Sequence, residues 1–232
     1  MTITENVALV RQRMLSTEAA AGISPGSTLL VAATKMNDAA RVREAILAGV
    51  DAGGENRVQE LTEKNAQGAY AGKPLHFIGH LQRNKVRQVV GVCSLIESVD
   101  SAELISLIGK RAVSLGITQD ILLEVNIGGE LSKSGVSPDE LPALLEAAAS
   151  TSGIQVRGLM AIPPISTISG QNRPFFARMR QLWVDIGSKK YNNVIMDFLS
   201  MGMSGDFEDA ILEGSNMVRV GTAIFGARNY DL

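Results

Sequence analysis

A lysine at the end of an apolar run is the first residue whose type and position could do chemistry. Lys35 directly follows TLLVAAT (28–34), a run rich enough in branched residues to form a buried strand. An ammonium group drawn into a partly desolvated site has a lowered pKa, and its free amine can attack a carbonyl carbon. Position alone supports a ligand-binding lysine and an ordinary solvated turn lysine about equally.

A glycine-rich segment near the other end of the sequence is the second candidate, as a seat for an anion. GTAIFG (221–226) combines Gly221, the hydroxyl of Thr222 and backbone N–H groups at an expected helix start, an arrangement that suits phosphate. The segment SMGMSG (200–205), which begins with Ser200, adds serines and glycines beside it. A terminal helix packed for stability would show the same glycine spacing, and that interpretation stays open.

An arginine precedes this segment. Arg219 lies two residues before Gly221, so alternation along a strand places both on the same face. A buried guanidinium needs a partner. We expect Arg219 either to pair with an interior carboxylate, such as Glu124 or Glu55, or to hydrogen-bond a heteroaromatic nitrogen of a ligand. Together with Lys35, these features point to a phosphate-bearing aldehyde as the ligand.

Other kinds of site have little support in the sequence. His76 and His80 are the two histidines, and neither HExxH nor a carboxylate cluster occurs, so we expect no metal site. GMSGD (202–206) lacks the second glycine that a nucleophile elbow requires. Lys133, in the loop after the fifth apolar run, is a second lysine. Whether Lys133 or His80 touches a ligand stays open.

The elements that must position these residues follow one rhythm, a short apolar run, a polar turn and an amphipathic segment, which is typical of βα units. Eight such units in a chain of this length predict an α/β fold, a single (β/α)8 TIM barrel over residues 1–232, with the site at the carboxyl ends of the strands. A doubly wound sheet is the alternative, but its GxGxxG fingerprint is missing. The expected strands are 28–34, 51–56, 75–79, 94–99, 120–127, 154–162, 196–202 and 216–221.

An extra amphipathic helix is expected before the first strand. It would end near Gly22, and its apolar stripe begins at Ile3. Thr2 and Glu5 have the spacing of a capping box at its start.

Composition excludes several classes of function. The 232 residues include 22 Lys and Arg against 24 Asp and Glu, and aromatic residues make up 4%, so we expect no nucleic-acid binding. No apolar run approaches the roughly 18 residues of a membrane span, and no secretory leader is evident, so we expect a cytoplasmic protein without membrane contact. The single cysteine, Cys93, fits a reducing compartment and is expected to be a small buried side chain rather than a nucleophile.

Several longer motifs are spread along the chain. They are VAATK (31–35), GGENRVQE (53–60), HFIGHLQRNK (76–85), SVDS (98–101), LLEVNIGGELSKSG (122–135), GLMAIPP (158–164), FLSMGMSGDFEDAI (198–211) and VRVGTAIFGAR (218–228). In these motifs the chain resembles, over nearly its whole length, the pyridoxal phosphate homeostasis proteins, which are similar to the isolated barrel domain of bacterial alanine racemase. That family commonly has an aromatic residue before and after GEN, where this chain has Gly53 and Arg57.

The resemblance implies a role for each candidate residue. Lys35 would carry pyridoxal 5′-phosphate as a Schiff base, and Arg219 would face the pyridine nitrogen with Asn56 near the ring. The phosphate would be held by Ser200, Gly221 and Thr222. An arginine at the ring nitrogen keeps that nitrogen unprotonated, because two positive charges in contact are costly, and such a ring is a poor electron sink.

We therefore expect a protein that carries, buffers or delivers the cofactor, with little or no turnover and no catalytic residue of its own. An amino-acid racemase is the alternative. It would need a second acid or base opposite Lys35, yet Tyr70, Tyr191 and Tyr230 do not follow strands, and we expect no length for a second domain that could supply one. A class I aldolase acting on sugar phosphates ranks third. Cofactor delivery implies transient contact with apo-enzymes, and the resemblance favours a monomer.

Overall fold

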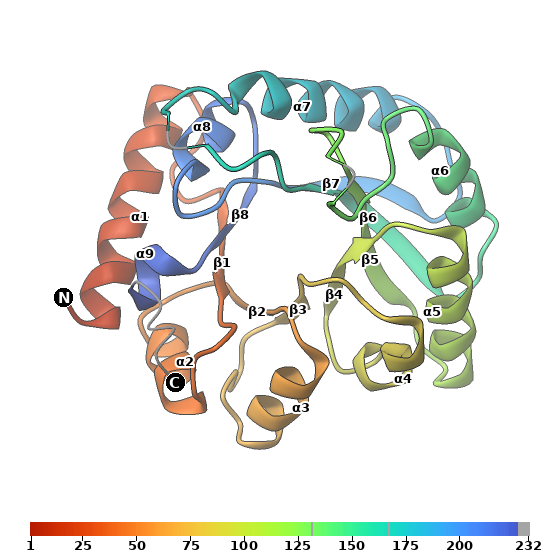
Figure 1. The fold of residues 1–232 in the computed structure, drawn as a ribbon, viewed down its shortest axis with the longest axis horizontal. Helices are drawn as coiled ribbons and strands as arrows, with labels where there is room; N and C mark the ends of the chain where they lie inside the picture. Colours follow the sequence, from red (N-terminus) through yellow and green to blue (C-terminus); the bar gives the residue numbers. More distant parts are fainter. Residues whose placement is uncertain (131, 167, 227–232) are drawn as a thin grey trace.

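A closed barrel of eight parallel strands forms the centre of the molecule (Figure 1). The computed structural model describes residues 1–130, 132–166 and 168–226, so Tyr230 lies outside the described residues. Each strand pairs with its neighbours in sequence, and β8 pairs with β1, which excludes the doubly wound alternative. All eight expected runs lie on strands, which are β1 (Leu29–Ala33), β2 (Ala52–Glu55), β3 (Leu75–Phe77), β4 (Leu95–Val99), β5 (Gln119–Val125), β6 (Ile154–Ala161), β7 (Val194–Ser200) and β8 (Met217–Val220).

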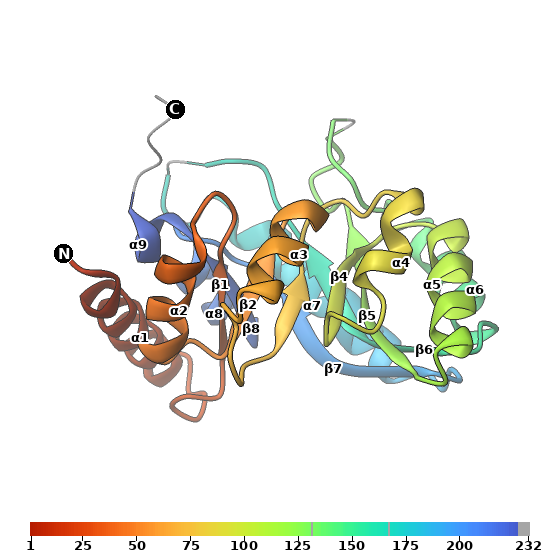
Figure 2. The ribbon, with the colours of Figure 1, turned by 90° about the horizontal axis from the view of Figure 1, so that it is seen from below.

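Helices surround the barrel wall and alternate with the strands (Figures 1 and 2). Figure 2 shows the loop after β5, in green, rising above the carboxyl ends of the strands. The helices are α1 (Ile3–Ala20), α2 (Ala39–Leu47), α3 (Val58–Ala66), the 3-10 turn η1 (Arg83–Lys85) with α4 (Val86–Val89), α5 (Ala102–Ser114), α6 (Leu141–Ala149), α7 (Arg173–Gly187), α8 (Phe207–Leu212) and α9 (Thr222–Phe225).

The extra N-terminal helix, α1, lies outside this ring against the last helices of the chain. Its predicted capping box is confirmed, because Thr2 and Glu5 exchange both hydrogen bonds. The side-chain amide of Asn6 donates to the carbonyl oxygen of Ile224 in α9 at 2.8 Å. Arg13 forms an ion pair with Glu208 in α8 at 2.6 Å. Helix α1 therefore links the start of the chain to the segment that contains the predicted anion seat.

Two apolar regions fill the fold. The larger lies between strands and helices and includes the buried apolar face of α1 and Cys93. Burial raises the pKa of the Cys93 thiol, which is 4% exposed, so the prediction of a buried cysteine is confirmed. The smaller region includes Val31, Leu122 and Met217 and fills the barrel interior. Among the described residues, none of the helices is long and apolar enough to cross a bilayer.

Candidate functional site

Lys35 lies two residues beyond β1, at the carboxyl end of the barrel, and is half-buried. The preceding residue, Thr34, donates its backbone N–H to the carbonyl oxygen of Gly54 at 2.9 Å and its hydroxyl to Glu55 at 2.5 Å. Since side chains alternate along an extended segment, Lys35 belongs to the opposite face from Thr34, the face that Val31 occupies inside the barrel.

The peptide groups on both sides of Lys35 are held by one ion pair from α3. The ammonium of Lys64 donates to the carbonyl oxygen of Thr34 at 2.8 Å and to Glu60 at 2.9 Å. Glu60 in turn accepts the backbone N–H of Met36 at 2.7 Å. Although burial opposes ionisation, the hydrogen bonds from Lys64 and Met36 lower the pKa of Glu60. Met36 has a φ of 61°, a left-handed conformation that such contacts must hold in place.

A buried carboxylate on the outer side of the barrel wall completes this support. Glu55 is fully buried, and its Oε1 accepts hydrogen bonds from Thr34, from Lys64 at 2.7 Å and from Tyr70 at 2.8 Å. Burial and the nearby Glu55 raise the pKa of Tyr70, so this hydroxyl keeps its proton. Glu55 faces away from the barrel interior and is not the partner of Arg219, which corrects one of the two expected pairings.

Tyr70 also explains why this chain can have a glycine at position 53, where the family that it resembles commonly has an aromatic residue. A Cβ atom added at Gly53 would lie 2.6 Å from Cδ1 of Tyr70. The Tyr70 ring thus fills the space that a side chain at position 53 would need. An aromatic ring is retained against this part of β2, but it comes from the loop after α3.

Asn56 lies at the carboxyl end of β2 and lines a cavity of about 250 Å³ at the barrel mouth. Its amide oxygen is buried and accepts no hydrogen bond within the described part of the chain. A Cβ atom at Gly79 would lie 2.2 Å from the carbonyl oxygen of Asn56, so only glycine permits this packing. The other lining residues are Ile78, His80, Glu124, Lys133, Ser134 and Ile162.

Arg219 is buried in the barrel as the sequence predicts, with 4% of its surface exposed. Its guanidinium donates to the hydroxyl of Ser200 at 2.5 Å and to the carbonyl oxygen of Ala161 at 2.9 Å. Ser200 donates to Glu97 at 2.6 Å, and Arg219 and Glu97 are 3.7 Å apart. The carboxylate beside Arg219 is therefore Glu97, a residue that sequence reasoning missed.

Glu97 is the middle member of a row of buried polar side chains that crosses the barrel interior. Its second oxygen lies 2.7 Å from Nδ1 of His76, on the neighbouring strand β3. Burial opposes the charge of Glu97, but His76, Arg219 and Ser200 together lower its pKa. Burial lowers the pKa of Arg219, and nearby carboxylates, Glu97 first among them, oppose that effect. The row fixes the guanidinium in position and supplies a countercharge.

The sequence suggested Glu124 only as a partner for Arg219 and did not predict that it lines the mouth cavity. It lies on β5 and lines the same cavity as Asn56. Burial and the neighbouring Asp100 raise the pKa of Glu124 to about 7, with Arg219 opposing that shift. The barrel mouth therefore contains a carboxyl group that gains and loses a proton near neutral pH.

The segment predicted to seat an anion lies at the start of α9. The hydroxyl oxygen of Ser204 accepts the N–H groups of Gly221 at 3.1 Å and of Ala223 at 3.2 Å, which is the coordination an anion oxygen would also receive. Thr222 is exposed beside them. Ser200, which the sequence singled out, lies deeper, next to Arg219. Both serines belong to the segment 200–205, but the folded chain places Ser200 against Arg219 and Ser204 against the start of α9.

Lys133 and His80 both reach the barrel mouth from loops that follow strands. Lys133 donates to the carbonyl oxygen of Pro163 at 2.9 Å and pairs with Glu130. The hydroxyl of Ser134 lies 3.3 Å from Nδ1 of His80. The loops after β3, β5 and β6 are thus tied together over the cavity that Asn56 and Glu124 line.

The chain is similar to known proteins along almost its full length. The family model "Alanine racemase, N-terminal domain" matches residues 2–229. Relatives named pyridoxal phosphate homeostasis protein include one from Pseudomonas aeruginosa, 41% identical over 99% of this chain and 97% of its own. Another, from Aquifex aeolicus, is 40% identical over 99% and 100%. The solved structure of PipY from Synechococcus elongatus with PLP bound matches with a TM-score of 0.83 at 33% identity, covering 97% of this chain and 100% of that one.

Proposed function

The chain belongs to the pyridoxal phosphate homeostasis protein family, within the group that shares the alanine racemase N-terminal domain, and from this we propose that it binds pyridoxal 5′-phosphate and carries, buffers or delivers it. It does so with little or no turnover of its own. The structure of PipY with PLP bound supports the choice of cofactor.

We propose that the cofactor is held at the carboxyl end of the barrel by the residues the sequence singled out. When bound, pyridoxal phosphate supplies an aldehyde that forms a Schiff base with an amine, and Lys35 is the amine. Gly221 and Thr222 bind the phosphate, with Ser200 below them and the hydroxyl of Ser204 as an added ligand. The residues fit such a group, because the amide oxygen of Asn56 lines the cavity without a donor from the described residues.

The single observation that favours cofactor handling over catalysis is the buried Arg219. A guanidinium keeps its proton at neutral pH, and Glu97 and Ser200 hold it rigidly in the barrel. Beside a pyridine nitrogen it disfavours protonation of the ring and so weakens the cofactor as an electron sink. The chain's own residues thus bind and orient the cofactor while suppressing its carbanion chemistry.

The racemase alternative gains one supporting observation. Lys35 follows β1 and Glu124 lies on β5, which are on opposite sides of an eight-stranded barrel. Glu124, with a pKa of about 7, could hold the second proton that racemisation requires. Solvent deuterium incorporation at the α-carbon of L-amino acids separates the two functions, because a carrier incorporates none above free cofactor.

We further propose that residues 1–232 form one domain that works as a cytoplasmic monomer and contacts apo-enzymes transiently. Packing of α1 on α8 and α9 through Asn6 and Arg13 supports the single domain. The buried, reduced Cys93 is compatible with a reducing compartment.

Absorbance tests the proposed function directly. Purified protein mixed with pyridoxal phosphate is expected to turn yellow, and borohydride is expected to fix the cofactor on Lys35, identified by peptide mass. Lys35→Ala should fold but stay colourless, whereas Lys189→Ala, at an exposed lysine of the α7–β7 loop, should behave like the wild type. Unchanged colour in Lys35→Ala would overturn the assignment.

A further inference from the structure

A groove on the outer surface, between α4 and α5, is strongly cationic although the chain as a whole has a formal net charge of −2. Its volume is about 700 Å³, within the roughly 300–1,000 Å³ of small-molecule sites. Four of its eight lining residues are basic and none is acidic. These four are Arg83, Arg87, Lys110 and Arg111.

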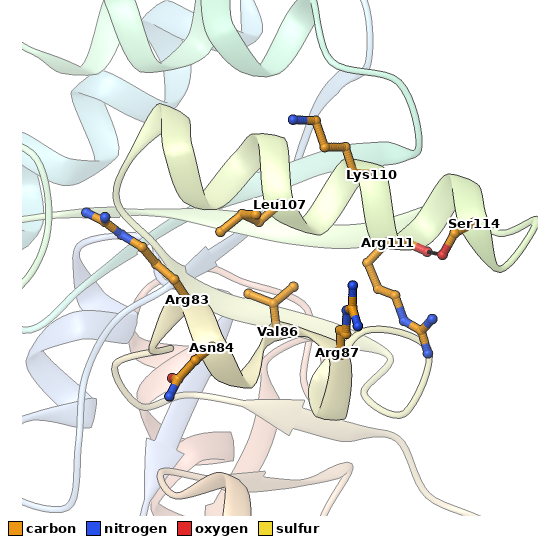
Figure 3. Close-up of a pocket in the computed structure, with 8 residues that line it drawn as sticks. All are labelled: Arg83, Asn84, Val86, Arg87, Leu107, Lys110, Arg111 and Ser114. Atoms are coloured by element: carbon orange, nitrogen blue, oxygen red, sulfur yellow. Dashed lines mark hydrogen bonds between the residues drawn. The ribbon is translucent and has the colours of Figure 1, made fainter.

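Three of these four cations have no countercharge among the described residues. Arg83 pairs with Glu103 at 2.8 Å, whereas Arg87, Lys110 and Arg111 form no ion pair within the part of the chain that the structure describes. Figure 3 shows Arg87 rising from α4 and Arg111 descending from α5 into the same space. Like charges gathered in one groove repel each other, so the groove favours an anion that neutralises them.

A buried donor without an acceptor points the same way. The Nε atom of Arg111 is buried and makes no hydrogen bond in the described residues. Buried polar groups are almost always satisfied, so an unsatisfied one calls for an explanation, of which a bound water or ion is one. A guanidinium presents its N–H groups in a planar fork that matches phosphate oxygens.

The floor of the groove is apolar, which defines the rest of the ligand. Val86 is buried and Leu107 is partly buried, and both lie between the two helices (Figure 3). The arrangement therefore combines apolar surface for a flat ring with cations for a doubly charged group. A phosphomonoester carries close to two charges at neutral pH and can neutralise two guanidinium groups, whereas a carboxylate neutralises one.

A hollow of about 590 Å³ has lining residues in common with both the groove and the barrel mouth. This hollow shares Arg83 and Asn84 with the groove and shares His80 with the mouth cavity. We propose that the groove between α4 and α5 is a second binding site, distinct from the barrel site, for a phosphomonoester that carries a flat ring. Its phosphate binds Arg87 and Arg111, and its ring packs on Val86 and Leu107.

Amide chemical shifts of the wild-type protein provide the test, because they report the groove and the barrel seat separately. Pyridoxine 5′-phosphate, which has no aldehyde, and adenosine 5′-monophosphate are titrated in parallel with inorganic phosphate and unphosphorylated pyridoxine. At least one of the two esters should shift residues of α4 and α5 saturably, and whichever does so identifies the source of the ligand. Unphosphorylated pyridoxine should not shift these residues. Binding of inorganic phosphate as tight as that of either ester would overturn the proposal, because the apolar floor would then contribute nothing.

The matched variants remove equal charge at two places. Arg87→Gln combined with Arg111→Gln removes both guanidinium groups that reach the space between α4 and α5 and should weaken ester binding there at least tenfold. Lys189→Gln combined with Lys190→Gln, at exposed positions outside the groove, should leave it unchanged. Shifts near Gly221 report the barrel seat, so failure of the groove site is distinguishable from failure of the proposed function. Absence of saturable shifts in α4 and α5, or equal affinity in both double variants, would refute the groove site.

Discussion

At the scale of single residues, the barrel contains two carboxylates whose environments give them opposite properties. Glu97 is surrounded by His76, Ser200 and Arg219, and these partners keep it ionised despite complete burial. Glu124 lines the cavity near Asp100, and burial favours its protonated form. The difference matters for function because one carboxylate is a fixed countercharge for Arg219 and the other exchanges a proton near neutral pH.

Glu124 should make stability depend on pH. Its pKa is about 7 in the folded protein and about 4.3 in an unfolded chain, so the folded state holds the proton more tightly. The contribution of Glu124 to the free energy of unfolding is fully present below the unfolded pKa of about 4.3 and is lost as pH rises through 7. Glu124→Gln cannot ionise and should avoid roughly 2–3 kcal/mol of this loss of stability. In urea unfolding, the variant should therefore be more stable than the wild type at pH 8 and about as stable at pH 5. Glu146→Gln, at an exposed position, is the control, and parallel pH profiles for wild type and Glu124→Gln would contradict the expectation.

At the scale of elements, helix α3 determines where the β1–α2 turn presents Lys35. Lys64 and Glu60 bind the peptide groups before and after that residue, and Glu55 anchors Lys64 from the barrel wall. Lys64, Glu60 and Glu55 therefore position Lys35 through the backbone of the turn rather than through its side chain.

Glu60→Ala should loosen this turn without removing the buried pair of Lys64 and Glu55. We expect the free energy of unfolding to fall by about 1–2 kcal/mol, because the N–H of Met36 loses its charged acceptor. Formation of the yellow complex with pyridoxal phosphate should slow several-fold, with a shifted pH dependence of its absorbance. Glu63→Ala, on the exposed side of the same helix, should change neither property. A variant as fast as wild type would show that the clamp has no positioning role.

At the scale of the whole molecule, α1 connects the start of the chain to the anion seat near its end. Asn6 and Ile224 are 218 residues apart in sequence, and their hydrogen bond fixes α9 against α1. Because α9 begins at Thr222, directly after Gly221, the packing of α1 contributes to the shape of the seat although none of its residues lies there.

Asn6→Ala should therefore affect cofactor affinity as well as stability. Loss of one partly buried hydrogen bond is expected to cost about 1 kcal/mol in urea unfolding. Equilibrium dialysis should show a two- to fivefold weaker affinity for pyridoxal phosphate. Leu9→Ala, on the exposed face of α1, is the matched control. Equal affinity in both variants would mean that α1 only stabilises the barrel.

The sequence alone determined the eight βα units, the extra helix with its capping box, and the positions of Lys35, Asn56 and Arg219 near strand ends. These features depend on periodicity and local turn chemistry, which neighbouring residues specify. Only the tertiary structure decided that Glu97, rather than Glu55 or Glu124, forms the ion pair with Arg219, that Tyr70 fills the space at Gly53, and that the hydroxyl of Ser204 accepts the N–H groups of Gly221 and Ala223. Ser200 and Glu97 are 103 residues apart, and the cationic groove joins two separate helices. Contacts between distant segments form only when the barrel closes, and local sequence patterns do not specify them.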